Sequence, residues 1–262
     1  MTQPAFPAAL LNIAAEPQMK QLLREIDEAV VRIRFAEGLR RGWEAARAEA
    51  SVQLAHFEAQ QGGARTDLSE LRLATLGRSA DDPALLTALD YWKAHRLVQK
   101  GWAPLNTKTP MRVVEAPLPR MLSQIHKTLT ARLHADGRIA SSDVAILKDP
   151  SALAAIRAVL DSPLPAPLRA GMLIWLAKQR PAFASHSSEV ARVLARHHLV
   201  QTGFEPTGTL LTSRTIDAAA LASLGNPDPS TWLHAYAQAM ASALDPTLRM
   251  IQSVQAGILP SE

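Results

Sequence analysis

Apolar residues recur at intervals of three and four along most of the chain, and this spacing limits its fold more than any other feature. In the first clear case, a stretch that begins near Pro17, the apolar positions share one face of a helix: Leu22, Ile26, Ala29, Val30 and Ile33. Alanine, leucine and arginine, all good helix formers, dominate the composition, while runs of β-branched residues are short and scattered. We therefore predict an all-α protein.

The composition excludes several classes of protein. With 262 residues, 47% hydrophobic and 20% charged, the chain can bury a sizeable core and is not of the disordered type. The net charge of +4 comes from scattered arginines, which argues against a dedicated nucleic-acid binder. The absence of cysteine excludes disulfides and thiolate zinc sites. With neither a leader-like segment nor an apolar run of about 18 residues, we expect a soluble, cytoplasmic protein of bacterial type.

Loop signals gather between Gly101 and Arg120, in the sequence GWAPLNTKTPMRVVEAPLPR. We take this segment as the border between two parts of the chain. Residues 1–105 are expected to form an N-terminal helical region that begins with an apolar arm, Met1 to Glu16. Residues 106–262 are expected to form a helical core, and the two parts to pack as one compact unit.

A short polar loop at residues 181–188, PAFASHSS, separates two apolar helical patterns. A loop that leads into a helix presents free backbone N–H groups and the positive end of the helix dipole, which favour a phosphate or a carboxylate. Ser187 or Ser188 can cap the second helix, and Arg192 adds a positive charge about one turn later. These three residues predict a weak phosphate- or nucleotide-binding site.

The same loop resembles the motif of the Fic family, HxFx(D/E)GNGRxxR. Aligned without gaps, residues 181–192 keep the phenylalanine, Phe183, and the final arginine, Arg192. The other motif positions have changed: Pro181 replaces the histidine, Ser185 the acid, His186-Ser187-Ser188 the Gly-Asn-Gly and Glu189 the first arginine. The resemblance implies a Fic-like helical bundle, with a small β-hairpin flap at residues 137–149.

These changes remove the chemistry that the resemblance implies. In Fic enzymes the histidine is the general base, the acid holds Mg²⁺, and the glycine-rich turn and arginines hold the phosphates of ATP. Pro181 has no titratable group, and the Ser185 hydroxyl is a poor sole ligand for Mg²⁺. The Glu189 carboxylate would repel a triphosphate. We therefore expect a degenerate member of the family without catalytic residues at these positions.

The resemblance also gives Glu58 a regulatory position. Many bacterial-type Fic proteins carry an inhibitory helix, (S/T)xxxE(G/N), whose glutamate pairs with the first arginine of the motif. Residues 54–59 match this pattern at Glu58 alone, and the arginine is replaced by Glu189, so the usual salt bridge is not expected. Because carboxylates are mostly solvated, we expect Glu58 to be an exposed helix glutamate.

The histidines do not converge on a metal ion. His186 and Glu189 are one turn apart, but His197 lies about 16 Å further along the helix axis, too far to share an ion with them. His126 has no carboxylate or serine at a spacing that would pair with it, so we expect a structural histidine.

Three functions remain open at this point. The first is a catalytically degenerate Fic-like protein that binds or regulates a protein partner, with a homo-oligomer also open. The second is a nucleotidyl (AMP) transferase that uses ATP and Mg²⁺ with Arg180, His186 or His126 in unusual roles. The third is a DNA-associated regulator, which ranks last because the arginines are scattered along the sequence instead of clustered. Stabilisation by nucleotides that depends on Arg192 would distinguish the second from the first.

Overall fold

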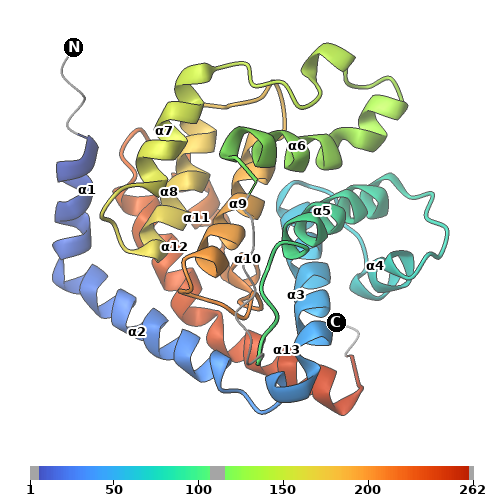
Figure 1. The fold of residues 1–262 in the computed structure, drawn as a ribbon, viewed down its shortest axis with the longest axis horizontal. Helices are drawn as coiled ribbons and strands as arrows, with labels where there is room; N and C mark the ends of the chain where they lie inside the picture. Colours follow the sequence, from blue (N-terminus) through green and yellow to red (C-terminus); the bar gives the residue numbers. More distant parts are fainter. Residues whose placement is uncertain (1–5, 107–115, 260–262) are drawn as a thin grey trace.

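The computed structural model describes residues 6–106 and 116–259, and within these ranges the chain is helical, with no β-strand (Figure 1). The N-terminal part forms five helices: α1 (Phe6–Ala15), α2 (Pro17–Arg34), α3 (Leu39–Gln61), α4 (Leu68–Thr75) and α5 (Pro83–Gln99). The middle contributes four more: α6 (Leu118–Ala135), α7 (Pro150–Leu160), α8 (Ala166–Gln179) and α9 (Ser187–Gln201). The last four are α10 (Thr212–Thr215), α11 (Ala218–Ser223), α12 (Ser230–Ser242) and α13 (Leu244–Ala256). The all-α prediction is confirmed.

Aspartate caps explain why several helices begin where they do. The Asp82 carboxylate accepts from the backbone N–H groups of Ala84 and Leu85, which have no partner inside α5. Equivalent aspartates stand before three other helices: Asp67 at α4, Asp149 at α7 and Asp217 at α11. Proline in the first turn favours α2, α5 and α7. A backbone N–H in the first turn has no acceptor within the helix, and proline has no N–H to satisfy.

Helices α8 and α9 run side by side through the middle of the molecule, and most of their residues are buried. Gly171 brings α8 close to α12, since a Cβ there would lie 2.9 Å from Cδ1 of Tyr236. The Gly171 carbonyl also accepts a hydrogen bond of 2.8 Å from the Trp232 indole N–H. The packing of α8, α9 and α12 forms the centre of the hydrophobic core.

The first and last parts of the chain are interleaved. Helix α2 packs on α12, α3 packs on α13, and α5 packs on both α6 and α9. One hydrophobic cluster runs from Leu10 to Ile251. The predicted border near residue 105 adjoins 107–115, a segment outside the described residues, so the division into two parts stays a prediction.

Two local predictions differ from the structure. The stretch expected as an arm contains helix α1, which packs on α2 through the buried side chains of Leu10 and Ile13. No hairpin forms in residues 137–149, which contain only the 3₁₀ turn η1 (Ser141–Asp143). Ala145 has a positive φ of 61°, which interrupts an extended strand, and its N–H bonds to His126 instead of to a neighbouring strand.

The segment from Glu205 to Leu211 is irregular but mostly buried. Its carbonyl groups therefore need donors from elsewhere. The Arg47 guanidinium of α3 donates to the carbonyls of Pro206 and Thr207, at 2.8 and 2.7 Å. Arg196 of α9 donates to the Gly208 carbonyl at 2.6 Å. Two arginines thus supply hydrogen bonds that a helix or sheet would otherwise supply.

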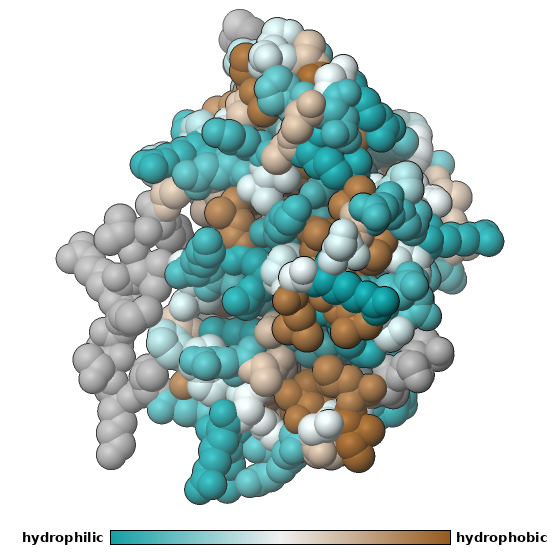
Figure 2. All heavy atoms as spheres, turned by 90° about the vertical axis from the view of Figure 1, so that its right-hand side faces the viewer, coloured by the Kyte–Doolittle hydropathy of each residue, from teal (hydrophilic) through white to brown (hydrophobic). Residues whose placement is uncertain are grey.

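In the part of the chain that the structure describes, no helix combines the length and the hydropathy needed to cross a membrane. The face on the right of Figure 1 is largely hydrophilic, with apolar side chains gathered in patches between polar ones (Figure 2). Leu73 and Leu76 at the end of α4 are among the exposed apolar residues, and Leu76 is 84% exposed.

Candidate functional site

The polar loop between α8 and α9 is closed by its own side chains. The Ser187 hydroxyl accepts a hydrogen bond of 2.9 Å from the Phe183 N–H and donates one of 3.3 Å to the Phe183 carbonyl. His186 occupies the cap position of α9 in a left-handed conformation, φ 57°, and no side chain caps the helix there. The prediction that Ser187 or Ser188 caps α9 is therefore wrong, because the Ser187 hydroxyl points back into the loop.

His126 of α6 fastens this loop to the segment that precedes α7. Its ring stacks on the Phe183 ring with centroids 4.2 Å apart. Nδ1 accepts from the Ala145 N–H at 3.0 Å, which leaves Nε2–H to donate to the Ser185 carbonyl at 3.1 Å. Burial lowers the pKa of His126 to about 4, since the charged imidazolium is disfavoured away from water. The expectation of a structural histidine is confirmed.

The remaining motif-equivalent positions separate into two groups. On one side, Pro181 is exposed, and the half-buried His186 contacts the Ser185 hydroxyl through Nδ1 at 2.9 Å. On the other side, the Glu189 carboxylate accepts a hydrogen bond of 3.2 Å from the Tyr91 hydroxyl of α5. Burial and, next, the Glu189 charge raise the pKa of Tyr91, so this hydroxyl stays a donor. Ser188 is half-buried in the first turn of α9.

Glu58 is buried rather than exposed, with 2% of its surface accessible. His95 of α5 donates from Nε2 to its carboxylate at 3.0 Å, and the Ser213 hydroxyl donates at 2.8 Å. Burial on its own would raise the Glu58 pKa, but His95, then Arg192 and Ser213, stabilise the carboxylate and lower it. The expectation that Glu58 is exposed was wrong. It rested on the average behaviour of carboxylates, whereas α3 is covered by α5, α10 and α13.

Arg192 and Arg196 lie one turn apart on α9 and line a cavity of about 40 Å³ together with Glu58, Glu205 and Ser213. Arg196 donates to the Ser51 hydroxyl and the Gly208 carbonyl, and burial lowers its pKa to about 9. Burial raises the pKa of the Glu205 carboxyl. Within the described residues the Arg192 guanidinium makes no hydrogen bond or ion pair, and its charge helps to lower the pKa of Glu58.

This cavity cannot hold a nucleotide in the conformation described. Sites for small molecules usually measure roughly 300–1,000 Å³, whereas 40 Å³ holds only water. A second cavity beneath the loop, beside Phe183 and Ser187, is smaller still at about 10 Å³. Phosphate binding by Ser187, Ser188 and Arg192 therefore remains a prediction. Among the described residues, no three His, Cys, Asp or Glu side chains are grouped as metal ligands would be.

Sequence reasoning missed His95, Ser213 and Glu205, which complete the polar surroundings of Glu58 and Arg192. One signal was present: Arg192 and Arg196 are four residues apart and so share a helix face. The contacts themselves join positions 37 and 155 residues apart, and local spacing carries no information about them.

Comparison with known proteins identifies the fold. A crystal structure of a Fic family protein from Desulfovibrio desulfuricans G20 matches with a TM-score of 0.68 and covers 94% of this chain and 77% of that one. The sequence identity is 12%, so the match shows a Fic-like fold and nothing beyond the fold. No family model matches the chain. No curated protein matches it either.

Proposed function

We propose that this protein with a Fic-like fold is a binding or regulatory module that has lost the Fic catalytic set. One observation carries the proposal: the buried Glu58 carboxylate, fixed by His95 and Ser213, faces Arg192, the one charged motif position that the loop retains. A carboxylate in this place competes with any phosphate for the arginine. The cavity between them measures about 40 Å³, which supports a site closed to nucleotides.

The loop has no general base at the position that the Fic motif gives to it. Pro181 stands at the position that the resemblance gives to the histidine and cannot take a proton. Both ring nitrogens of His126 are engaged in hydrogen bonds, with Ala145 and Ser185. In the part of the chain that the structure describes, the ring nitrogens of His186 make one hydrogen bond, with the neighbouring Ser185 hydroxyl, so an AMP transferase would depend on this residue.

We propose that the partner is a protein, which could be a second copy of this chain. We also propose that this protein is cytoplasmic. The exposed apolar side chains support a protein partner, since binding surfaces commonly combine apolar patches with a polar rim. Leu73 and Leu76 are exposed at the end of α4, and Ile146, next to Ala145, is 48% exposed.

The test is a thermal-shift series with ATP, GTP, CTP and UTP, each with and without Mg²⁺. The proteins compared are the wild type, Glu58→Gln, which removes the competing charge, and Arg192→Ala. Arg157→Ala, an exposed arginine on α7, is the matched control. We expect no nucleotide-dependent shift in any of the four, each protein being compared with itself in the absence of nucleotide.

A different result would favour the transferase. A rise of several degrees with one nucleotide in the wild type or in Glu58→Gln, kept in Arg157→Ala and lost in Arg192→Ala, would show a working phosphate site at α9. His186→Ala would then separate binding from transfer, because loss of AMP transfer with unchanged nucleotide binding would identify His186 as the base.

A further inference from the structure

The end of α2 exposes two apolar side chains among arginines. Val31 and Phe35 are four residues apart, so they lie on one side of the helix, and they are 54% and 76% exposed. Four arginines between residues 31 and 41 are exposed: Arg32, Arg34, Arg40 and Arg41. The one exposed acid in this stretch, Glu37, is paired with Arg40 at 3.3 Å. We call residues 31–41 the basic patch.

The basic patch is held in place by the packing of the turn between α2 and α3. Gly38 in this turn is buried against α13, where a Cβ would lie 2.7 Å from Cγ2 of Ile251. The Phe35 N–H donates to the Val31 carbonyl at 3.2 Å, and the Arg34 guanidinium lies over the Phe35 ring, 5.9 Å from its centroid. The two apolar side chains are therefore presented from an ordered backbone, which lowers the entropic cost of binding.

A second exposed apolar pair, at the end of α4, is surrounded by the opposite charge. Leu73 is 41% exposed and Leu76 is 84% exposed. Four acids between residues 67 and 82 are exposed: Asp67, Glu70, Asp81 and Asp82. The one exposed cation in this stretch is Arg78. We call residues 67–82 the acidic patch.

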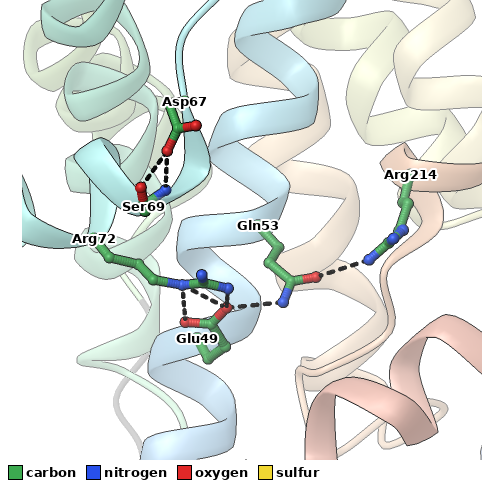
Figure 3. Close-up of polar contacts among 6 residues, drawn as sticks. All are labelled: Glu49, Gln53, Asp67, Ser69, Arg72 and Arg214. Atoms are coloured by element: carbon green, nitrogen blue, oxygen red, sulfur yellow. Dashed lines mark hydrogen bonds and ion pairs between the residues drawn. The ribbon is translucent and has the colours of Figure 1, made fainter. Parts of the chain in front are cut away.

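Two contacts fix the acidic patch in place (Figure 3). The Asp67 carboxylate accepts from the backbone N–H of Ser69 at 2.7 Å and so caps α4. Arg72 of α4 holds the buried Glu49 carboxylate of α3 at 2.6 Å. Because the charge of Arg72 is paired with Glu49, it does not neutralise the exposed acids of the patch.

We propose that the basic patch binds the acidic patch of a second copy of this chain. The inference rests on the proposed function, in which the partner is a protein. Contact between the two patches buries both apolar pairs and brings exposed charges of opposite sign together. It thereby covers four of the eight large apolar side chains that are exposed among the described residues. An anionic membrane would suit the basic patch alone and would leave Leu73 and Leu76 in water.

Sedimentation velocity of the full chain between about 1 and 100 μM measures the self-association. We expect the average mass of the wild type to rise with concentration at low salt, and to fall toward that of the monomer at high salt, which screens exposed charges. Phe35→Ser and Leu76→Ser are each expected to weaken the association by about tenfold or more. Both side chains are exposed, so the substitutions leave the fold intact. Leu11→Ser, at an exposed leucine of α1, is the matched control and is expected to associate like the wild type.

An equimolar mixture of Phe35→Ser and Leu76→Ser distinguishes contact between unlike patches from contact between like ones. Each variant keeps the patch that the other has lost, so the mixture is expected to associate where neither variant does alone. A mixture no stronger than its components, or equal association in all the proteins, would overturn the proposal. A wild type that stays a monomer at low salt would also overturn it. Binding of that monomer to phosphatidylserine vesicles, lost in Phe35→Ser, would assign the basic patch to a membrane instead.

Failure of this inference is distinguishable from failure of the proposed function. Arg192, on which stabilisation by nucleotides would depend, belongs to neither patch. A monomeric wild type would leave another protein as the partner and the proposed function unchanged. A nucleotide-dependent thermal shift that is lost in Arg192→Ala and kept in Phe35→Ser would overturn the proposed function, and the mixing experiment would still decide the contact between copies.

Discussion

Glu58 of α3 and Arg192 of α9 face each other across a cavity inside the protein, with His95 and Ser213 bonded to the Glu58 carboxylate. Burial is the largest single influence on the Glu58 carboxyl and on its own would favour the uncharged acid. The charges of His95 and Arg192 nevertheless keep the Glu58 pKa below its ordinary value. A charged group is therefore stable here only while its partners stay in place. This dependence makes Glu58 a sensitive position for substitution.

We expect Glu58→Gln to lower the free energy of unfolding by about 3 kcal/mol, measured by urea denaturation, because it leaves His95 and Arg192 without the opposite charge. The control is Glu37→Gln. Glu37 pairs with Arg40 on the surface, where both side chains are more than half exposed, and its loss is expected to cost less than about 0.5 kcal/mol. Equal small effects in the two variants would contradict the structure of the Glu58 cluster.

Stability is expected to fall in mildly acidic solution. Burial lowers the pKa of His126, His197 and His198 to about 4, from 6.5 in an unfolded chain. Between pH 6.5 and 4 the unfolded state therefore binds protons that the folded state does not, and stability decreases as the pH falls through this window. Above pH 6.5 these groups are neutral in both states, so they add no pH dependence to the stability. Thermal unfolding followed across this range checks the prediction.

His198→Leu isolates one of these histidines. Nε2 of His198 is buried without a hydrogen-bond partner among the described residues. Leucine therefore removes the titrating group without breaking a hydrogen bond to Nε2. The acid-dependent loss of stability is expected to shrink by up to about 3 kcal/mol. His134→Leu, at an exposed histidine of α6, should keep the full loss. An identical acid dependence in both variants would refute the role of His198.

Gly208→Ala is expected to destabilise the protein more than Gly203→Ala. Both glycines have positive φ, 67° and 71°, so alanine costs about 1–2 kcal/mol at either position. At Gly208 the added Cβ would also overlap the Trp102 indole ring, whereas at Gly203 it meets no atom within 4 Å. Denaturation of the two variants measures the difference, and equal losses would argue against the close approach of Trp102.

His126→Ala is expected to release the contact between the α8–α9 loop and the segment before α7. The Ala145 amide then loses its acceptor on His126, and its hydrogen exchange should become faster. His134→Ala, on the same helix, should leave this amide unchanged. Unchanged protection of Ala145 in His126→Ala would mean that another group holds the segment in place.

The sequence was most informative where the signal is local. The spacing of Ile26, Val30 and Ile33 predicted a helix from Pro17, and all three side chains are buried on α2. The Asp82-Pro83 pair is a typical start of a helix, and Asp82 accepts two N–H groups of α5. Helix periodicity and capping depend on residues within one or two turns, so a single sequence contains the information.

The features that the sequence did not reveal depend on distant or unusual backbone contacts. A positive φ at Ala145, a residue with a Cβ, is not expected from its type and replaces the predicted hairpin. The motif alignment located the loop but could not show that the Ser187 hydroxyl forms hydrogen bonds with the Phe183 backbone. The surroundings of Glu58 come from α5 and from the chain beside α10, which only the folded packing brings together.

The buried segment after α9 has a consequence for the order of folding. The carbonyls of residues 206–208 reach their donors only when α3 and α9 are both in place, and Arg47 is about 160 residues away along the chain. Contacts between residues so far apart in sequence form more slowly than a helix, because closing a long loop costs conformational entropy. We therefore expect the segment to become ordered late, and its amides to exchange through unfolding of the whole molecule instead of local opening.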